Sequence, residues 1–293
     1  NLISRFVFGL VLGLAALAWL ASVVLEQTTR VWFEKDLALR ALAPQMIRAR
    51  LPRATIITFW HIPWPNPERF SICPYRIQIL EGLLGSSILG FHTQFHCNNF
   101  LDAVDRFLEA RLDREQHGVI LKGSTTLVRP YPISIEWPAH WLQDLPSPAE
   151  CRAGVLAELG LPPGVRLGVG VDRLDYTKGI VERLKAVERT LERFPELRGK
   201  LVFVQLAAPS RTVIESYRQL SESVELLARR INERFGAGDY QPVILRRAHH
   251  EPPTVFRFYR AADFCYVSSL HDGMNLVAKE YVAARDDERG VLI

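Results

Sequence analysis

Residues 166–180 read RLGVGVDRLDYTKGI. Arg166–Val171 is a short apolar run of the kind found in buried β-strands, and the turn after it carries the cations Arg173 and Lys178. Apolar residues then recur at steps of four and three residues, at Ile180, Leu184, Val187, Leu191 and Phe194. This spacing predicts an amphipathic helix, so the stretch predicts one strand–turn–helix unit of an α/β fold. The GxG at 168–170 is not a dinucleotide fingerprint, because Arg173 stands in the place of the third glycine.

Further strands and helices are predicted to alternate on both sides of this unit. The predicted strands are Thr55–Phe59, Ser87–Phe91, Thr125–Val128, Leu201–Leu206, Val243–Leu245 and Phe264–Val267, and Val291–Ile293 resembles the beginning of another. The predicted helices are Val31–Arg50, Tyr75–Leu84, Phe95–Leu112, Val213–Phe235 and Asn275–Arg285. Such alternation is typical of parallel sheets with helices on both faces, in which ligands bind at the carboxyl ends of the strands.

The composition is that of a globular protein with one large or two smaller domains. The chain has 293 residues, of which 48% are hydrophobic and 23% are charged, and this excludes a disordered chain or a disulfide-stapled mini-protein. A formal net charge of +4 without a short basic cluster does not indicate nucleic acid and favours anionic small molecules as partners. The 4 cysteines form no CxxC pair, which is typical of a reducing compartment.

The segment at residues 6–25, FVFGLVLGLAALAWLASVVL, carries no charge. A helix of this length spans roughly 30 Å, the thickness of a bilayer core, whereas a signal peptide has a shorter apolar core and a small-residue cleavage site. Positive residues are more frequent after the segment than before it, at Arg30, Lys35, Arg40 and Arg48 against Arg5. We therefore predict a single-pass transmembrane anchor in residues 1–30, in the inner or cytoplasmic membrane, with the soluble part in the cytoplasm.

Two loops at predicted strand ends carry positive or polar side chains suited to a phosphorylated ligand. His61 follows the strand Thr55–Phe59 in a loop held by two prolines, Pro63 and Pro65, although a lone histidine is more often structural. Arg173 and Lys178 can make charge-assisted bonds to a diphosphate, and free N–H groups at the start of the following helix add partial positive charge. The alternative for these two cations is a solvated turn in which neighbouring aspartates pair with them.

A third loop follows Phe264–Val267 and contains Asp272 and Gly273 directly before a predicted helix. Backbone amides in this place can face an anion, while the Asp272 carboxylate can accept hydrogen bonds from hydroxyl groups. Glu280 lies about two turns into the helix. The alternatives are a plain N-cap for Asp272 and a surface position for Glu280. Together the three loops predict a site for a sugar nucleotide.

Four segments resemble the trehalose-6-phosphate synthase family of retaining glycosyltransferases: HIPWP at 61–65, GVDRLDYTKGI at 170–180, VQLAAPSR at 204–211 and HDGMNLVAKEYVAAR at 271–285. The similarity extends from about Pro44 to Ile293. It implies the GT-B fold, in which two Rossmann-like domains with parallel sheets face a cleft. The chain would hold an incomplete acceptor-side domain at 31–148 and a sugar-nucleotide-binding domain at 149–293. The implied reaction moves glucose from UDP-glucose to glucose 6-phosphate and gives trehalose 6-phosphate and UDP.

The resemblance also implies roles for individual residues on the donor side. Arg173 and Lys178 would bind the donor diphosphate. Asp272 would hold hydroxyl groups of the glucose, and Glu280 would bind the ribose hydroxyl groups. Backbone amides would serve the phosphate and the sugar at Gly273, Met274, Asn275 and Leu276.

On the acceptor side, His61 would contact the transferred glucose near the reacting centre, and Arg211 would bind the acceptor phosphate. The residues implied in catalysis are His61, Arg173, Lys178 and Asp272. No metal ion or other cofactor is expected. The expected partners are a sugar nucleotide, a sugar phosphate and the membrane, but no nucleic acid, and whether the chain forms homo-oligomers is left open.

The chain departs from the family pattern in its first part. Family members carry a glycine-rich donor loop, acceptor-binding aromatic residues and a Trp-x-His-Asp-Tyr segment before the stretch equivalent to Pro44–Pro52, and none of these is present here. We therefore expect a fragment, or an internal deletion near Ala41–Pro44. Two alternative functions stay open: a glucosylglycerol-phosphate synthase using ADP-glucose and glycerol 3-phosphate, and an inactive, membrane-tethered sugar-nucleotide-binding fragment.

Overall fold

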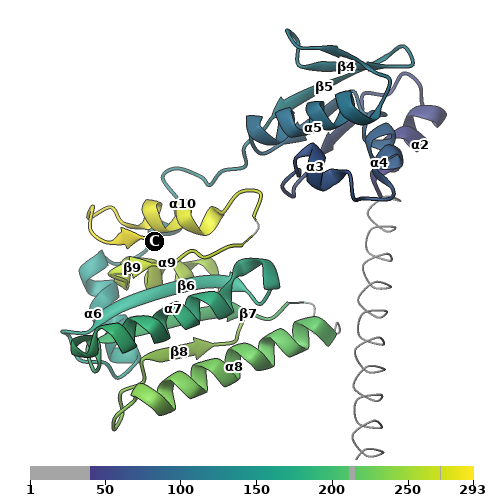
Figure 1. Ribbon diagram of the computed structural model, residues 1–293. Helices are drawn as coiled ribbons and strands as arrows, with labels where there is room; N and C mark the ends of the chain where they lie inside the picture. The colour runs from purple at the N-terminus through teal and green to yellow at the C-terminus, as the bar shows by residue number, and fades with distance from the viewer. Residues whose placement is uncertain (1–39, 211–214, 271) are drawn as a thin grey trace, which may run out of the picture. The chain divides into compact units, whose positions relative to one another are not determined.

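The computed structural model describes residues 40–210, 215–270 and 272–293 (Figure 1). The predicted anchor in residues 1–30 and the predicted phosphate-binding residue Arg211 lie outside these residues. Within the described ranges, no helix is both long enough and apolar enough to cross a membrane.

The chain divides into two compact units between Pro132 and Ile133. The predicted boundary at residues 148 and 149 lies further along, at the start of helix α6 (Pro148–Glu158). The difference arises because the segment before α6 packs with the second unit. Ala139 in this segment is buried in the core of that unit, directly before the short 3₁₀ helix η1 (His140–Leu142).

The described part of the first unit contains a five-stranded sheet in the order β1-β2-β5-β4-β3. Strands β1 (Ile57–Phe59), β2 (Ile88–Phe91) and β5 (Ser124–Pro130) are parallel and lie within or around predicted strands. Strands β3 (Arg111–Asp113) and β4 (Gly118–Leu121) were not predicted and are antiparallel, so the expectation of a parallel sheet is corrected to a mixed sheet here.

A tight turn explains why β4 and β5 are antiparallel. Lys122 and Gly123 connect them with φ angles of 49° and 81°, and two residues with positive φ are typical of a β-hairpin turn. The helix predicted at Phe95–Leu112 is also too long, because α5 (Gln94–Phe107) ends where Leu108 adopts an extended conformation.

The described part of the first unit also contains helices α2 (Ala43–Arg50), α3 (Pro67–Phe70), α4 (Arg76–Leu83) and α5. Its core combines residues from α4, α5, the sheet and the loop after β1. Its fully or almost fully buried members include Trp64, Leu80, Leu89, Phe91, Phe100 and Val128.

The second unit contains a parallel sheet in the order β10-β9-β6-β7-β8. The strands are β6 (Arg166–Arg173), β7 (Leu201–Ala208), β8 (Val243–Arg246), β9 (Phe264–Cys265) and β10 (Val291–Leu292). Their places confirm the predicted strands of this half, although β6 is longer and β9 is shorter than expected.

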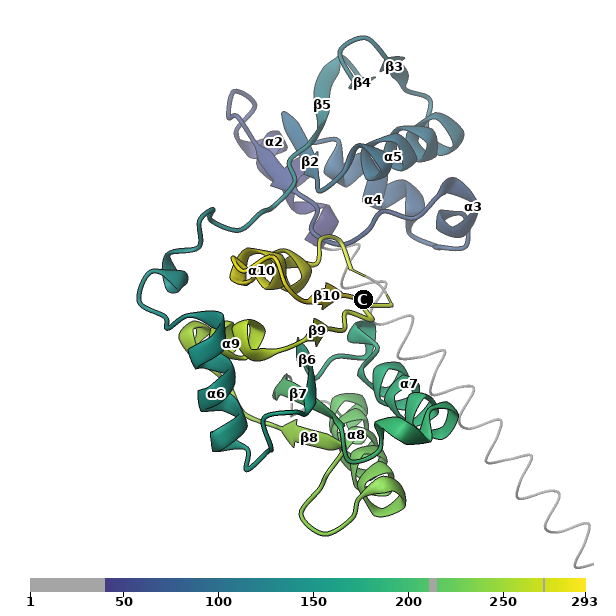
Figure 2. The same ribbon diagram turned by 90° about the vertical axis from the view of Figure 1, so that its left-hand side faces the viewer.

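Helices cover both faces of this sheet, as Figure 2 shows. Helices α7 (Ile180–Arg193) and α8 (Glu215–Phe235) pack on one face, while α6, α9 (Pro252–Ala261) and α10 (Leu276–Ala284) pack on the other. Alternate residues of β7 enter the two cores: Val202 and Val204 face α9, and Leu201 and Phe203 face α7 and α8. This alternation is the period of a strand buried on both faces and confirms the α/β class.

Candidate functional site

A pocket of about 360 Å³ lies at the carboxyl ends of β6, β7 and β8 in the second unit. This is the edge of the sheet at which a ligand was predicted. Its polar lining consists of Asp172, Arg173, Lys178, His249 and His250, and its apolar walls include Val171, Leu206, Val255 and Val277. The pocket therefore combines two of the predicted phosphate-binding cations with apolar surface.

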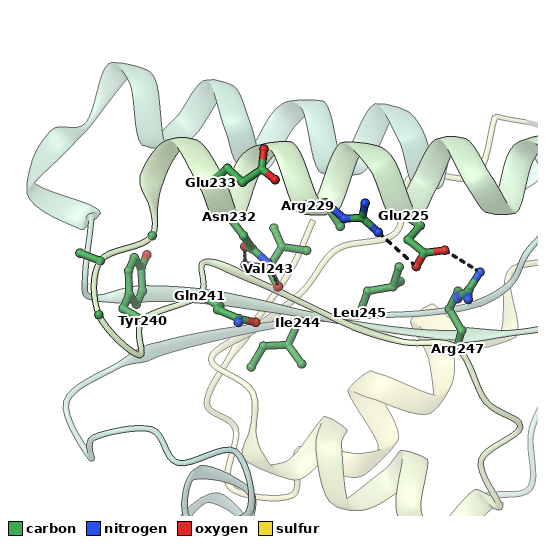
Figure 3. Close-up of a pocket in the computed structure, with 14 residues that line it drawn as sticks. Glu225, Arg229, Asn232, Glu233, Tyr240, Gln241, Val243, Ile244, Leu245 and Arg247 are labelled. Carbon is green, nitrogen blue, oxygen red and sulfur yellow. Dashed lines mark hydrogen bonds and ion pairs between the residues drawn. The ribbon is translucent and has the colours of Figure 1, made fainter.

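A larger pocket of about 590 Å³ lies between α8 and the edge strand β8 (Figure 3). Several of its polar groups pair with one another or with the backbone. Glu225 lies 3.8 Å from Arg229 and 3.1 Å from Arg247, and the Asn232 amide bonds both the N–H and the carbonyl of Val243. None of the predicted site residues that the structure describes lines this pocket, so the pocket at the strand ends is the better candidate.

The turn that carries the two cations is fixed by Asp175. Its carboxylate accepts hydrogen bonds from the backbone N–H and the hydroxyl of Thr177, at 3.0 and 2.9 Å, and from the Tyr217 hydroxyl at 3.3 Å. Burial favours a higher pKa for Asp175, but these hydrogen bonds and the charge of Arg173 hold its pKa below the ordinary value. Asp175 thus shapes the turn that leads to Lys178.

Arg173 is the last residue of β6, two positions beyond the end of the predicted strand, and is exposed. Among the residues that the structure describes, it has no hydrogen-bonded or ion-paired side-chain partner. The neighbouring Asp172 pairs instead with Arg183 of α7 at 2.7 Å. The alternative in which the local aspartates neutralise both cations by direct pairing is therefore wrong, and the Arg173 guanidinium is available to an anion at the pocket.

Lys178 and Asp272 meet across 94 residues of sequence, with 2.6 Å between Nζ and Oδ2. Both side chains are only 19% exposed. The Asn275 amide also donates to the Asp272 carboxylate, at 3.2 Å. Burial raises the pKa of Asp272, but the hydrogen bond and charge of Lys178, together with Asn275, bring its pKa below the ordinary value. The structure thus brings the predicted diphosphate and sugar residues together.

Asn275, rather than Asp272, caps helix α10. Its side-chain oxygen accepts the N–H of Ala278 at 2.9 Å, so the alternative role of Asp272 as an N-cap is wrong. The first amides of the helix, from Leu276 onwards, have no carbonyl partner four residues earlier within the helix. Gly273 and Met274 lie in the half-buried loop between Asp272 and the cap, in the place where amides were predicted to face the ligand.

Glu280 is half-buried on α10 and accepts a hydrogen bond from the Tyr259 hydroxyl at 3.1 Å. Burial raises the pKa of this carboxyl, although the hydrogen bond from Tyr259 opposes the rise. Because Tyr259 is completely buried, Glu280 is held in place and is not a free surface residue.

His61 belongs to the first unit and is exposed in the loop after β1. Its Nδ1 lies 3.2 Å from Nε2 of His92, and the two rings form an edge-to-face pair. The same loop is anchored by Trp64, whose carbonyl accepts a hydrogen bond from Asn99 at 3.1 Å. The loop that carries the exposed His61 is therefore held in place by the buried Trp64.

The sequence did not single out His249 and His250, which line the pocket. The available signal was their place shortly after β8, at the same carboxyl end of the sheet as Arg173. Burial, followed by the charges of Arg246 and His249, lowers the pKa of His250, which favours its neutral form. Across the described ranges, no group of three or more His, Cys, Asp or Glu residues is arranged to hold a metal ion.

We expect the contribution of Asp272 to stability to depend on pH. A carboxyl whose pKa is lower in the folded chain stabilises the fold above its unfolded pKa, and this contribution is lost as the pH falls through the folded pKa. Wild type should therefore be more stable than Asp272→Asn at neutral pH, and the two should converge in acid. Urea unfolding at a series of pH values measures the difference, and a difference that stays constant into acid contradicts the Lys178–Asp272 pairing.

Comparison with known proteins gives consistent matches. The family model for glycosyltransferase family 20 matches residues 22–293. The alpha,alpha-trehalose-phosphate synthase (UDP-forming) A of Dictyostelium discoideum is 36% identical over 253 residues, which cover 86% of this chain and 34% of that protein. The alpha,alpha-trehalose-phosphate synthase (UDP-forming) of Pichia angusta is 37% identical over 257 residues, which cover 86% of this chain and 54% of that protein.

Solved structures give a similar result. A structure described as trehalose-6-phosphate from E. coli bound with UDP-2-fluoro glucose matches with a TM-score of 0.78 and 34% identity, over 86% of this chain and 55% of that one. An alpha,alpha-trehalose-phosphate synthase (UDP-forming) from Burkholderia xenovorans in complex with glucose-6-phosphate matches with a TM-score of 0.78 and 32% identity, over 86% and 56%. The chain thus spans between 34% and 56% of the length of these four relatives.

Proposed function

The chain belongs to glycosyltransferase family 20, the family of its trehalose-phosphate synthase relatives, and from this membership we propose that it acts in glucose transfer from UDP-glucose to glucose 6-phosphate, giving trehalose 6-phosphate. The observation that carries the proposal is the meeting of Arg173, Lys178 and Asp272 at one edge of the parallel sheet. The ligands of two relatives, UDP-2-fluoro glucose and glucose-6-phosphate, support the choice of donor and acceptor.

Charge development explains the role of the two cations. When UDP departs, the sugar becomes oxocarbenium-like and the diphosphate gains negative charge. Arg173 and Lys178 stabilise this growing charge more strongly in the transition state than in the ground state, and this difference accelerates the reaction. Retention is explained by attack from the same face as the leaving group, with the departing phosphate oxygen taking the proton of the acceptor hydroxyl.

The Lys178–Asp272 pair prepares the site for a ligand that carries both a phosphate and a sugar. The donor phosphate would provide a new partner for the Lys178 ammonium, and a glucose hydroxyl would donate to the Asp272 carboxylate. Because both side chains already lie in place, little side-chain ordering is required on binding. Glu280, held by Tyr259, would accept hydrogen bonds from the ribose hydroxyl groups.

The acceptor side of the proposal rests on the family resemblance. His61 would contact the transferred glucose, and Arg211 would bind the phosphate of the acceptor. The transmembrane anchor at residues 6–25 also stays a prediction from the sequence.

A donor and acceptor panel with product identification by mass spectrometry tests the proposal. The full chain is incubated with UDP-glucose or ADP-glucose, each with glucose 6-phosphate or glycerol 3-phosphate. We expect trehalose 6-phosphate from UDP-glucose and glucose 6-phosphate. Glucosylglycerol phosphate from ADP-glucose would overturn the choice of donor and acceptor, and UDP binding without any product would reduce the function to that of a donor-binding fragment.

A further inference from the structure

Arg183 of helix α7 is a charged residue whose side chain has 0% exposure. Its guanidinium joins three neighbouring parts of the second unit. It lies 2.7 Å from the Asp172 carboxylate at the end of β6, donates to Gln205 of β7 at 2.8 Å, and donates to the Ser268 hydroxyl after β9 at 3.1 Å. Arg183 thus contacts, from inside the protein, the strands β6 and β7, which line the pocket at the strand ends, and the segment after β9.

Gly170 in β6 provides the space that this guanidinium occupies. A Cβ atom at this position would lie 2.5 Å from Nη1 of Arg183 and 2.6 Å from Oε1 of Gln205. Gly170, the second glycine of the GxG sequence, therefore permits the close approach of Arg183 to the strand. This explains the glycine without a dinucleotide fingerprint.

Ser268 carries the contact of Arg183 onward to the backbone beside Lys178. Its hydroxyl accepts from Arg183 and donates to the carbonyl of Gly179 at 2.8 Å, with the carbonyl of Lys178 at 3.3 Å. Gly179 has a φ of 63°, and a Cβ atom there would lie 2.2 Å from the carbonyl oxygen of Ser268. The chain after β9 and the turn after β6 are therefore in close backbone contact at this point.

The ion pair with Asp172 is not explained by stability alone. Two buried charges lose their hydration, and a pair of well-packed apolar residues is often equally stable or more stable. Asp172, however, lines the pocket beside Arg173. An unneutralised carboxylate in this place would repel a diphosphate through a medium of low dielectric constant.

We propose that Arg183 is a positioning residue for the donor diphosphate, acting through Ser268 on the backbone of Lys178 and through Asp172 on the charge of the pocket. The inference rests on the proposed function, because it takes the donor diphosphate as the ligand. Arg183 itself is buried behind these residues and does not line the pocket.

Three variants separate positioning from stability. Arg183→Met removes the guanidinium but keeps an unbranched side chain. Arg183→Met combined with Asp172→Asn also removes the carboxylate that would otherwise stay buried without its partner. Ser268→Ala removes only the hydroxyl, and Arg189→Met, on the exposed face of the same helix, is the matched control.

Each full-length variant is examined by urea unfolding, by calorimetric titration with UDP, and by amide hydrogen exchange at residues 177–180. We expect Arg183→Met to lose both stability and UDP affinity. The double variant should recover stability and the part of the affinity that the unneutralised Asp172 carboxylate would cost, but it should still bind UDP more weakly than wild type, since nothing holds Ser268. Ser268→Ala should keep most of its stability, bind UDP about tenfold more weakly, as expected for one lost hydrogen-bonded contact, and exchange faster at residues 177–180.

UDP affinity at the wild-type level in Ser268→Ala would overturn the proposal, because the hydroxyl would then not position Lys178. Wild-type affinity in the double variant would overturn it as well, because stability and removal of the Asp172 charge would then be sufficient for binding without Arg183. If the wild-type chain itself does not bind UDP, the proposed function fails. The exchange measurement then decides the positioning role alone: faster exchange at 177–180 in Ser268→Ala but not in Arg189→Met supports it, and unchanged exchange in Ser268→Ala overturns it.

Discussion

Arg173→Ala is expected to weaken UDP binding about tenfold to a hundredfold, because it removes a charge-assisted contact to the diphosphate. In turnover, the loss should correspond to about 2–4 kcal/mol of transition-state stabilisation, since the diphosphate gains charge as it leaves. Arg173 is exposed at the carboxyl end of β6, so the fold should keep its stability. Calorimetric titration with UDP and rates of product formation measure the two effects.

Arg166→Ala provides the matched control, because Arg166 begins the same strand and is also exposed. It lies at the amino end of the strand, whereas the proposed ligand site lies at the carboxyl ends of the strands. Its UDP affinity should equal that of wild type. Equal effects of the two substitutions would show that only the net charge of the chain matters, and would contradict the assignment of Arg173 to the diphosphate.

Trp64→Ala is expected to destabilise the first unit by about 3–5 kcal/mol, the usual cost of deleting a buried aromatic side chain. Trp64 is 2% exposed, and its ring centroid lies 4.9 Å from that of Phe70 and 5.0 Å from that of Phe100. The substitution leaves a cavity between the loop after β1 and helix α5. Urea unfolding followed by hydrogen exchange in α5 measures the loss within this unit.

Phe95→Ala is the control for this prediction, because Phe95 lies on α5 in the same unit but is 66% exposed. The free energy of opening that hydrogen exchange measures in α5 should lie within about 0.5 kcal/mol of the wild-type value, as for other surface substitutions. A comparable loss of stability in Trp64→Ala and Phe95→Ala would mean that α5 is generally sensitive to substitution. It would contradict the conclusion that Trp64 anchors the loop that carries His61.

The strands of the second unit and its helices α7, α8 and α10 were predictable because their apolar patterns are regular, whereas α6 and α9 were not predicted. The apolar run of β6 and the period of α7 extend over most of each element. Strands β3 and β4 were missed because they are short and because the turns before and after β4 depend on positive φ angles at His117 and Lys122, which are unusual for these residue types. Leu108 and Leu112 continued the helical spacing of α5, but the backbone becomes extended at Leu108.

The candidate site was predictable in its residue types but not in its pairings. Arg173, Lys178 and Asp272 stood out because cations and a carboxylate follow predicted strands. The Lys178–Asp272 contact depends on two strand ends that are distant in sequence but lie together in the sheet. Arg183 was not singled out by the sequence pattern, and its burial follows from the space left at Gly170.

Calorimetric titration of the full chain with UDP tests whether the pocket at the carboxyl ends of β6, β7 and β8 binds the nucleotide diphosphate of a sugar donor. We predict one binding site per chain, with affinity strongly reduced in Arg173→Ala and in Lys178→Ala and unchanged in Arg166→Ala. Absence of binding to wild type, or equal binding by wild type, Arg173→Ala and Lys178→Ala, would contradict the account.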